Sequence, residues 1–209
     1  MPEGVSPLSY AACVWAFEKI RQAGGLSVFC HPYWIAGGRY HPGMPLANHI
    51  FDTQLFDAYE VIGGYNADCD SNTLQTAHYH HQVAKGRRLP VVGITDAHST
   101  EKHRYFDTYY TVVFAPSADL ADLISSIRDL YSVAIESLPN DRPRPVGPMR
   151  LVKFALFLER EVFPQHDELC VEEGRLMQAY IAGKPGAADD LARLSGRTKA
   201  LYDKYWGSK

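Results

Sequence analysis

The sequence predicts an α/β fold of mostly parallel strands that is followed by an α-helical appendage. Short apolar runs alternate with helix-compatible segments from residue 9 to about residue 136, and this alternation is typical of βαβ units. Four prolines between residues 139 and 148 then predict a linker. The pattern beyond them is helical, with glycine- or proline-containing breaks. We therefore expect a domain over 1–138, a linker over 139–148 and a helical appendage over 149–209.

The first elements follow from apolar patterns and glycine stops. Residues 9–23 carry a broad apolar face and predict a helix that ends at Gly24-Gly25. The short apolar run 26–30 predicts a buried strand. The glycine- and proline-rich segment 37–45 predicts a loop, and a short helix is expected over 46–54.

The middle of the chain repeats the same order of elements. Residues 58–62 predict a second strand, and the glycines that follow it open a loop. A helix is expected over 72–85, because the segment is helix-compatible and stops at Gly86. Residues 90–95 then predict a third apolar strand.

Three further elements complete the expected domain. β-Branched and aromatic residues throughout 109–115 predict a fourth strand. Ser117 is the expected N-cap of a helix over 118–130, because its hydroxyl can accept a bond from an early helical N–H. Residues 132–135 predict the fifth strand, and we expect it to continue the parallel arrangement.

Composition excludes several classes of protein. The 209 residues are 46% hydrophobic and 22% charged, which argues against disorder and coiled coil. The net charge of -3 predicts no nucleic-acid partner bound through bulk charge. No apolar run approaches the ~18 residues of a membrane span, so we expect no membrane partner. The four cysteines form no CxxC pair and the start resembles no secretory signal, which together predict a cytoplasmic protein.

Chemically active side chains follow three of the expected strands. His31 comes after the first strand, Glu60 lies near the end of the second, and Asp96 and His98 follow the third. Carboxyl ends of parallel strands form the ligand-binding edge of α/β folds. Asp96 and His98 share one side of an extended segment. Imidazole and carboxylate ligands suit a divalent ion such as zinc, manganese or iron, although each residue alone is also compatible with an ordinary loop role.

The segments GGLSVFCHPYW, FDAYEVIGGYN and GRRLPVVGITDAHS occur in that order, and together they resemble the PHP (polymerase and histidinol phosphatase) family. The resemblance extends over about residues 16–136. It implies a distorted βα-barrel, similar to a TIM barrel, with metal ions at the carboxyl ends of the strands. It also implies a metal-dependent phosphoesterase, in which metal-activated water hydrolyses a small phosphorylated substrate.

The resemblance also implies roles for individual residues. His31, Asp96 and His98 match the HP and DxH elements of the family and are expected metal ligands. Glu60 and Asn66 match the acidic and amide positions of an "EVYN"-like strand end, which implies rim residues beside the metal.

Three more loop residues are candidates for contacts with the substrate. His103 follows the DxH element by five residues, and with Glu60 it would orient water or substrate; a solvated loop histidine is the alternative. Arg39 and Arg104 lie in expected rim loops, where a guanidinium group could bind a phosphate through two hydrogen bonds.

The chain departs from the family pattern upstream of His31. Only 30 residues precede His31, and they contain no histidine and therefore no HxH motif. We expect the carboxyl-terminal half of the barrel, with three ligands that suffice for one metal ion but not for a cluster. The open strand edges of half a barrel need to be covered, which predicts a homo-oligomer or a partner chain, unless the C-terminal helices cover them. The alternatives are a catalytically inactive remnant, a partner-binding subunit, or a mononuclear iron enzyme.

A second group of histidines lies on the expected helix 72–85. His78, His80 and His81 are not spaced i, i+4, so they do not form a tight helical pair. We expect a solvated helix face there.

Overall fold

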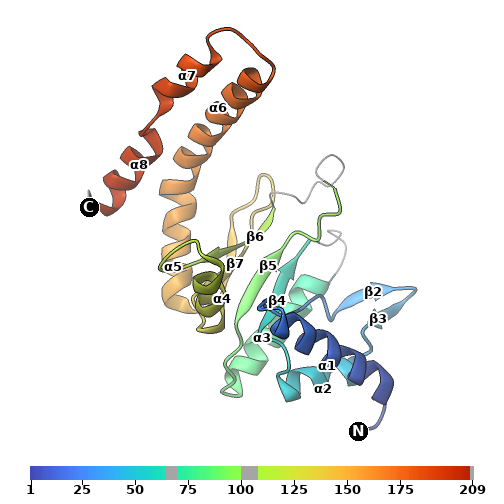
Figure 1. The fold of residues 1–209 in the computed structure, drawn as a ribbon. Helices are drawn as coiled ribbons and strands as arrows, with labels where there is room; N and C mark the ends of the chain where they lie inside the picture. Colours follow the sequence, from blue (N-terminus) through green and yellow to red (C-terminus); the bar gives the residue numbers. More distant parts are fainter. Residues whose placement is uncertain (65–69, 100–107, 208–209) are drawn as a thin grey trace. The chain divides into compact units, whose positions relative to one another are not determined.

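The computed structural model describes residues 1–64, 70–99 and 108–207 (Figure 1). The chain divides into two compact units, Met1–Lys153 and Phe154–Lys209. The first unit is mixed α/β and contains a parallel sheet of three strands in the order β1-β4-β5. The strands of this sheet are β1 (Val28–Phe29), β4 (Ala58–Gly63) and β5 (Val91–Ile94). No barrel closes among the described residues.

A second sheet has three antiparallel strands in the order β6-β7-β8. These strands are β6 (Tyr109–Val113), β7 (Ser132–Glu136) and β8 (Arg144–Val146). Strands β6 and β7 are antiparallel, so the parallel direction expected for this pair is wrong. The connection through helix α4 (Leu120–Arg128) brings the chain back to the end of β6, and β7 starts there, with Ser132 opposite Val113. An apolar strand pattern specifies burial and carries no information on direction.

Strand β5 makes a close contact with the second sheet. The Gly93 N–H donates to Thr111 Oγ1, and the same hydroxyl donates to the Gly93 carbonyl, both at 2.9 Å. A Cβ added at Gly93 would lie 2.5 Å from the Tyr110 carbonyl oxygen. Ser132 Oγ donates to the Val91 carbonyl at 2.7 Å, so β7 starts beside the start of β5 and runs in the same direction. Glycine is therefore required where the two sheets meet.

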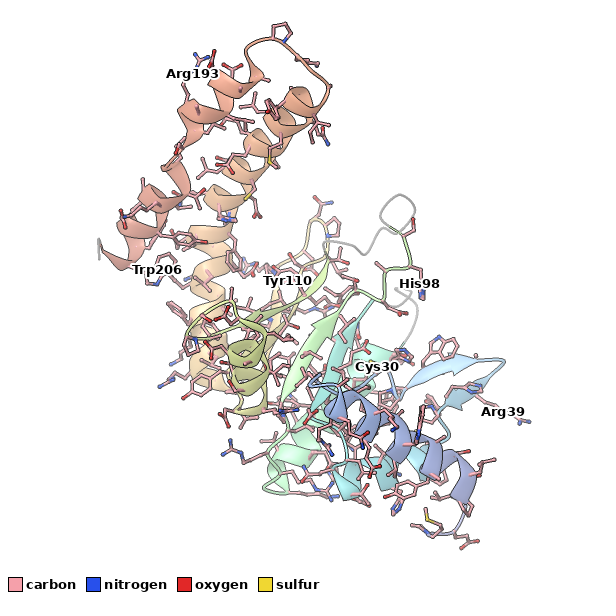
Figure 2. All side chains as sticks on the ribbon, in the orientation of Figure 1. Cys30, Arg39, His98, Tyr110, Arg193 and Trp206 are labelled. Atoms are coloured by element: carbon pink, nitrogen blue, oxygen red, sulfur yellow. The ribbon has the colours of Figure 1, made fainter. Side chains whose placement is uncertain are left out.

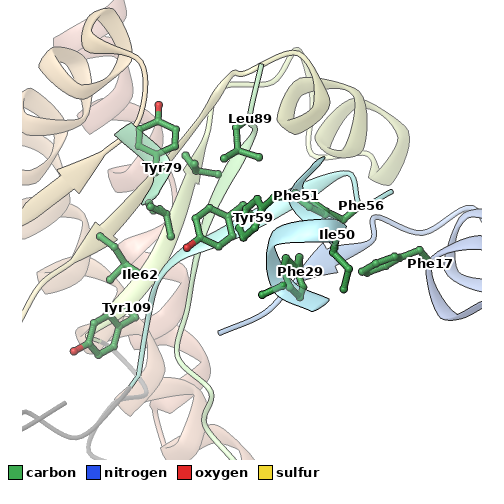
Figure 3. Close-up of a cluster of buried hydrophobic side chains, with 14 residues drawn as sticks. Phe17, Phe29, Ile50, Phe51, Phe56, Tyr59, Ile62, Tyr79, Leu89 and Tyr109 are labelled. Atoms are coloured by element: carbon green, nitrogen blue, oxygen red, sulfur yellow. The ribbon is translucent and has the colours of Figure 1, made fainter. Parts of the chain in front are cut away.

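Helices cover the parallel sheet and supply an aromatic core (Figure 3). These helices are α1 (Pro7–Gln22), α2 (Met44–Thr53) and α3 (Ser71–Ala84), each within two residues of its predicted range. Phe17 of α1, Phe51 of α2 and Tyr79 of α3 pack with Phe29 and Tyr59 of the sheet. The Phe51 and Tyr59 rings are 5.0 Å apart and nearly perpendicular, a favourable edge-to-face arrangement.

Part of the predicted loop 37–45 is a β-hairpin. Strands β2 (Trp34–Ala36) and β3 (Arg39–His41) pair in antiparallel fashion around Gly37 and Gly38. Both glycines have positive φ, at 56° and 74°, which a two-residue hairpin turn of this kind requires. The Gly-Gly pair was therefore the hairpin signal that the loop prediction missed.

Asp57 connects three elements at the amino edge of the parallel sheet. Its carboxylate accepts the Ser27 N–H at 2.9 Å, the Ser27 hydroxyl at 2.7 Å and Arg128 Nε at 3.0 Å. Burial raises the pKa of Asp57, but the hydrogen bonds from Arg128 and Ser27 and the charge of Arg128 outweigh it and lower the pKa. The carboxylate thus holds the starts of β1 and β4 and the end of α4 together.

The predicted N-cap of α4 is two residues too early. Helix α4 begins at Leu120, and Asp119 is its N-cap residue. The Ser117 hydroxyl instead accepts the Asp119 N–H at 3.1 Å and donates to the Asp122 carboxylate at 2.7 Å. Ser117 therefore stabilises the turn that leads into the helix.

The second unit is helical. The unit begins within α5 (Met149–Phe157), which leads through a π-helical turn (Leu158–Val162) into α6 (Phe163–Ile181). Helices α7 (Ala187–Leu194) and α8 (Arg197–Trp206) follow. The Tyr205 hydroxyl donates to the Glu161 carbonyl at 2.8 Å and joins α8 to the π-helical turn. Over the described residues, no helix has an apolar stretch of the length that crossing a membrane requires.

Candidate functional site

The carboxyl edge of the parallel sheet brings together residues that lie far apart in the sequence. His31 lies just beyond β1, Glu60 lies within β4, and Asp96 lies just beyond β5. The His31 N–H donates to Glu60 Oε2 at 3.0 Å across adjacent strands. Figure 2 shows Cys30 and His98 on this part of the unit. The strand-end rule therefore correctly predicts a common edge for these side chains.

Glu60 is a buried carboxylate, with a relative exposure of 1%. Tyr59 and Val61 face the aromatic core, so the alternation of the strand directs Glu60 to the other face. The register between β4 and β5 shifts between Glu60 and Ile62, which marks a local irregularity at this position. A buried carboxylate costs several kcal/mol unless hydrogen bonds or charges compensate it, and the His31 N–H is one such partner.

The thiol of Cys30 is close to the carboxylates of this edge. Burial, followed by the charge and hydrogen bonding of Glu60 and the charge of Asp96, raises the pKa of Cys30 to about 12. The thiol is therefore protonated at neutral pH, and its Sγ donates to the Val28 carbonyl at 3.7 Å. Cys30 is thus unsuited to act as a thiolate nucleophile or thiolate metal ligand at neutral pH.

Asp96 and His98 form a pair of possible ligands. Asp96 Oδ1 lies 3.5 Å from His98 Nε2, and the side chains are 42% and 77% exposed. Two ligands at about 2.0–2.1 Å from a tetrahedral zinc ion lie roughly 3.4 Å from each other, so this spacing fits one metal ion between them. The Ala97 N–H donates to Thr95 Oγ1 at 3.1 Å and holds the turn that carries the pair.

The backbone at two of the expected ligands is unusual. His31 has φ of 32° and Asp96 has φ of 52°, a region that non-glycine residues seldom occupy. Such conformations cost roughly 1–3 kcal/mol and cluster at functional sites, where the surrounding structure maintains them. Each of the two residues is separated by one residue from the end of a parallel strand, His31 from β1 and Asp96 from β5, on either side of β4.

A second buried carboxylate lies nearby, and the sequence analysis did not single it out. Glu136, at the end of β7, forms an ion pair with Arg144 of β8. Asn72 Nδ2 lies 3.5 Å from Glu136 Oε1, and the same amide bonds both the N–H and the carbonyl of Gly63 at the end of β4. The available signal was its position, because Glu136 immediately follows the predicted strand 132–135.

Of the remaining predicted site residues, the structure describes only Arg39. Arg39 lies on β3, is exposed and points away from the sheet edge that carries His98 (Figure 2). It is therefore not brought to the candidate site. Asn66, His103 and Arg104 lie outside the described residues, and their roles stay predictions.

The donor set fits a metal ion only in part. Nitrogen and oxygen donors of the expected kind are present in Asp96 and His98. Within residues 1–64, 70–99 and 108–207, however, no group of three His, Cys, Asp or Glu side chains is arranged to hold a metal ion. No family model, curated protein or solved structure matches the chain. The interpretation of this edge therefore rests on its own geometry.

Proposed function

We propose that the chain is a metal-dependent phosphoesterase of the PHP type, with a small phosphorylated substrate. The observation that carries the proposal is the 3.5 Å spacing of Asp96 Oδ1 and His98 Nε2, on the sheet edge that also carries His31. In this proposal His31, Asp96 and His98 hold a zinc, manganese or iron ion. A bound divalent ion would supply Lewis acidity toward a phosphoryl oxygen.

The residues of the chain would act chiefly by positioning. Glu60 accepts the His31 N–H and so maintains the turn in which His31 has positive φ. The Thr95 hydroxyl holds the turn that carries Asp96 and His98. Under the proposal, Glu60 orients water or substrate from its position at the end of this edge, and His103 keeps the assisting role that the sequence predicts for it.

Metal content tests the proposal directly. We expect about one equivalent of zinc, manganese or iron in the purified protein by plasma mass spectrometry, and loss of that metal in His98→Ala. His98 is exposed, so the variant should fold. His80→Ala, which removes an exposed imidazole from α3, is the matched control and should keep the metal. Absence of metal above background after reconstitution with each of the three ions would exclude the catalytic proposal.

A catalytically inactive, partner-binding subunit is the second candidate. Two observations on the described residues favour it: the barrel does not close, and no three ligands converge. The exposed side chains of Trp15 on α1 and Trp34 on β2, at 63% and 44%, could lie against a second copy or a partner chain. Sedimentation analysis should then show an oligomer that Trp15→Ser dissociates, whereas a monomer at all concentrations argues against self-association.

A further inference from the structure

A cavity of about 520 Å³ lies outside the candidate metal site. Its wall is formed by α2, α3 and the segment before β2, and it includes Tyr33, Asn48, His78, Gln82 and Lys85. Pockets that bind small molecules have volumes of about 300–1,000 Å³, so the size suits a metabolite. Most of the side chains in this wall are polar, which distinguishes the cavity from a packing defect of an apolar core.

A chain of hydrogen bonds runs along the wall of this cavity. The Tyr33 hydroxyl lies 2.7 Å from His78 Nδ1, and Gln82 Nε2 lies 2.5 Å from His78 Nε2. The His78 ring also packs against Phe51, with ring centroids 4.2 Å apart. Both ring nitrogens are thus engaged and the ring is held in place, so the solvated helix face predicted for His78 is wrong.

Gln82 has a polar atom that the protein does not satisfy. The residue is 4% exposed, and its Oε1 is buried without a hydrogen-bond partner among the described residues. Turning the amide over would give Oε1 the contact to His78 and would leave the NH2 group without one. In either orientation, one polar group in the wall of the cavity needs a bound water or ligand atom.

The wall of the cavity carries Lys85, His81 and Asp52, and the negative charge of Asp52 is balanced by its ion pair with Arg87. Burial, together with the charges of His81, Lys85 and Arg87, lowers the pKa of His78 to about 4. Asp52 acts in the opposite direction with the smallest effect, and its carboxylate accepts a bond from Arg87 at 2.8 Å. His78 is therefore neutral at pH 7 and can act as a hydrogen-bonding group, while the surrounding field favours an anion.

We propose that this cavity binds a small molecule through a carboxylate or phosphate group. Lys85 and His81, at the exposed side of α3, contact the anionic oxygens. Tyr33, His78 and Gln82 bind the polar body of the ligand and complete the hydrogen bonding of the buried amide. The site is independent of the proposed phosphoesterase activity, because it uses none of the expected metal ligands.

Side-chain NMR of the histidines tests this site. The full chain is titrated at pH 7 with inorganic phosphate and, separately, with sodium acetate, while the ring ¹⁵N resonances of His78 and His81 are recorded. We expect saturable shifts of both rings with at least one anion, and the anion that binds more tightly identifies the group recognised. Asp96→Asn should bind the same anion unchanged, which separates this site from the proposed metal site.

Lys85→Met provides the decisive variant. Lys85 is exposed, so the variant should fold, and we expect its dissociation constant for the anion to increase by about tenfold or more. Lys19→Met on α1 removes one positive charge elsewhere and should leave the affinity unchanged. The proposal is overturned if neither anion produces saturable shifts, or if Lys85→Met and Lys19→Met bind equally well.

Discussion

Replacement of Gly93 by alanine should destabilise the first unit, because this glycine lies where β5 meets the second sheet. The added Cβ would be 2.5 Å from the Tyr110 carbonyl oxygen, 3.2 Å from its carbon and 3.3 Å from the Ile135 nitrogen. All three atoms belong to the backbone of paired strands. No flexible side chain can therefore move aside to make room for the methyl group.

The magnitude follows from the displacement that the methyl group requires. Ordinary contact begins near 3.4 Å, so β5 and β6 must separate by 3.4 − 2.5 = 0.9 Å at this point. Overpacking of this kind costs about 1–3 kcal/mol. The separation also breaks the two hydrogen bonds between Thr111 Oγ1 and Gly93, each worth about 1 kcal/mol. We expect a decrease of about 3–5 kcal/mol in the free energy of unfolding.

Urea denaturation followed by tryptophan fluorescence measures this effect. Trp206 belongs to the second unit, so a Trp206→Phe background leaves Trp15 and Trp34 as reporters of the first unit. Gly43→Ala is the control, because its Cβ would meet open space, and it should change stability by no more than about 1 kcal/mol. A cost under about 1 kcal/mol for Gly93→Ala, with an unchanged m-value, would show that the two strands accommodate the methyl group without strain.

Three further predictions follow from the electrostatics. The unfolded chain protonates His78 near pH 6.5, but the folded ring is protonated only near pH 4. The free energy of unfolding should therefore decrease as the pH is lowered from 6.5 to 4, by about 1–2 kcal/mol for a half-buried ring. His78→Gln should flatten that decrease in urea titrations at several pH values; an unchanged slope argues against it. Asp57→Asn should cost about 1–3 kcal/mol at pH 7, and because the Asp57 pKa is lowered, the difference should shrink as pH falls below 3.8. Iodoacetamide at pH 8 should modify the exposed Cys170 before Cys30. Glu60→Gln should lower the pKa of Cys30 and accelerate its modification; equal rates of Cys30 modification with and without the substitution would contradict the contribution of Glu60 to this pKa.

The positions of the strands could be predicted from the sequence more readily than their directions. The apolar runs at 58–62 and 90–95 correspond to β4 and β5 within one residue at each end, because burial on both faces leaves a continuous hydrophobic signal. The run 26–30 contains only the two-residue strand β1. The antiparallel order of the second sheet depends on how α4 returns the chain, which is a property of tertiary packing.

The candidate site was predictable only where it depends on strand order. His31, Glu60 and Asp96 share an edge because parallel strands bring their carboxyl ends together. The positive φ values of the first and last of these residues could not be predicted, since neither is glycine. The partly buried environment of His78 depends on contacts with Tyr33 and with α2, which local spacing on α3 does not reveal.

The two edges of the parallel sheet differ in how much sequence change they can accept. At the amino edge, the Asp57 carboxylate bonds β1 and α4 at once, so almost any replacement disturbs several elements together. At the carboxyl edge, the exposed Asp96 and His98 lie in a turn, and their side chains can be exchanged with little effect on the core. Divergence of activity within this fold would therefore be confined to the carboxyl edge, while the amino edge would preserve the architecture.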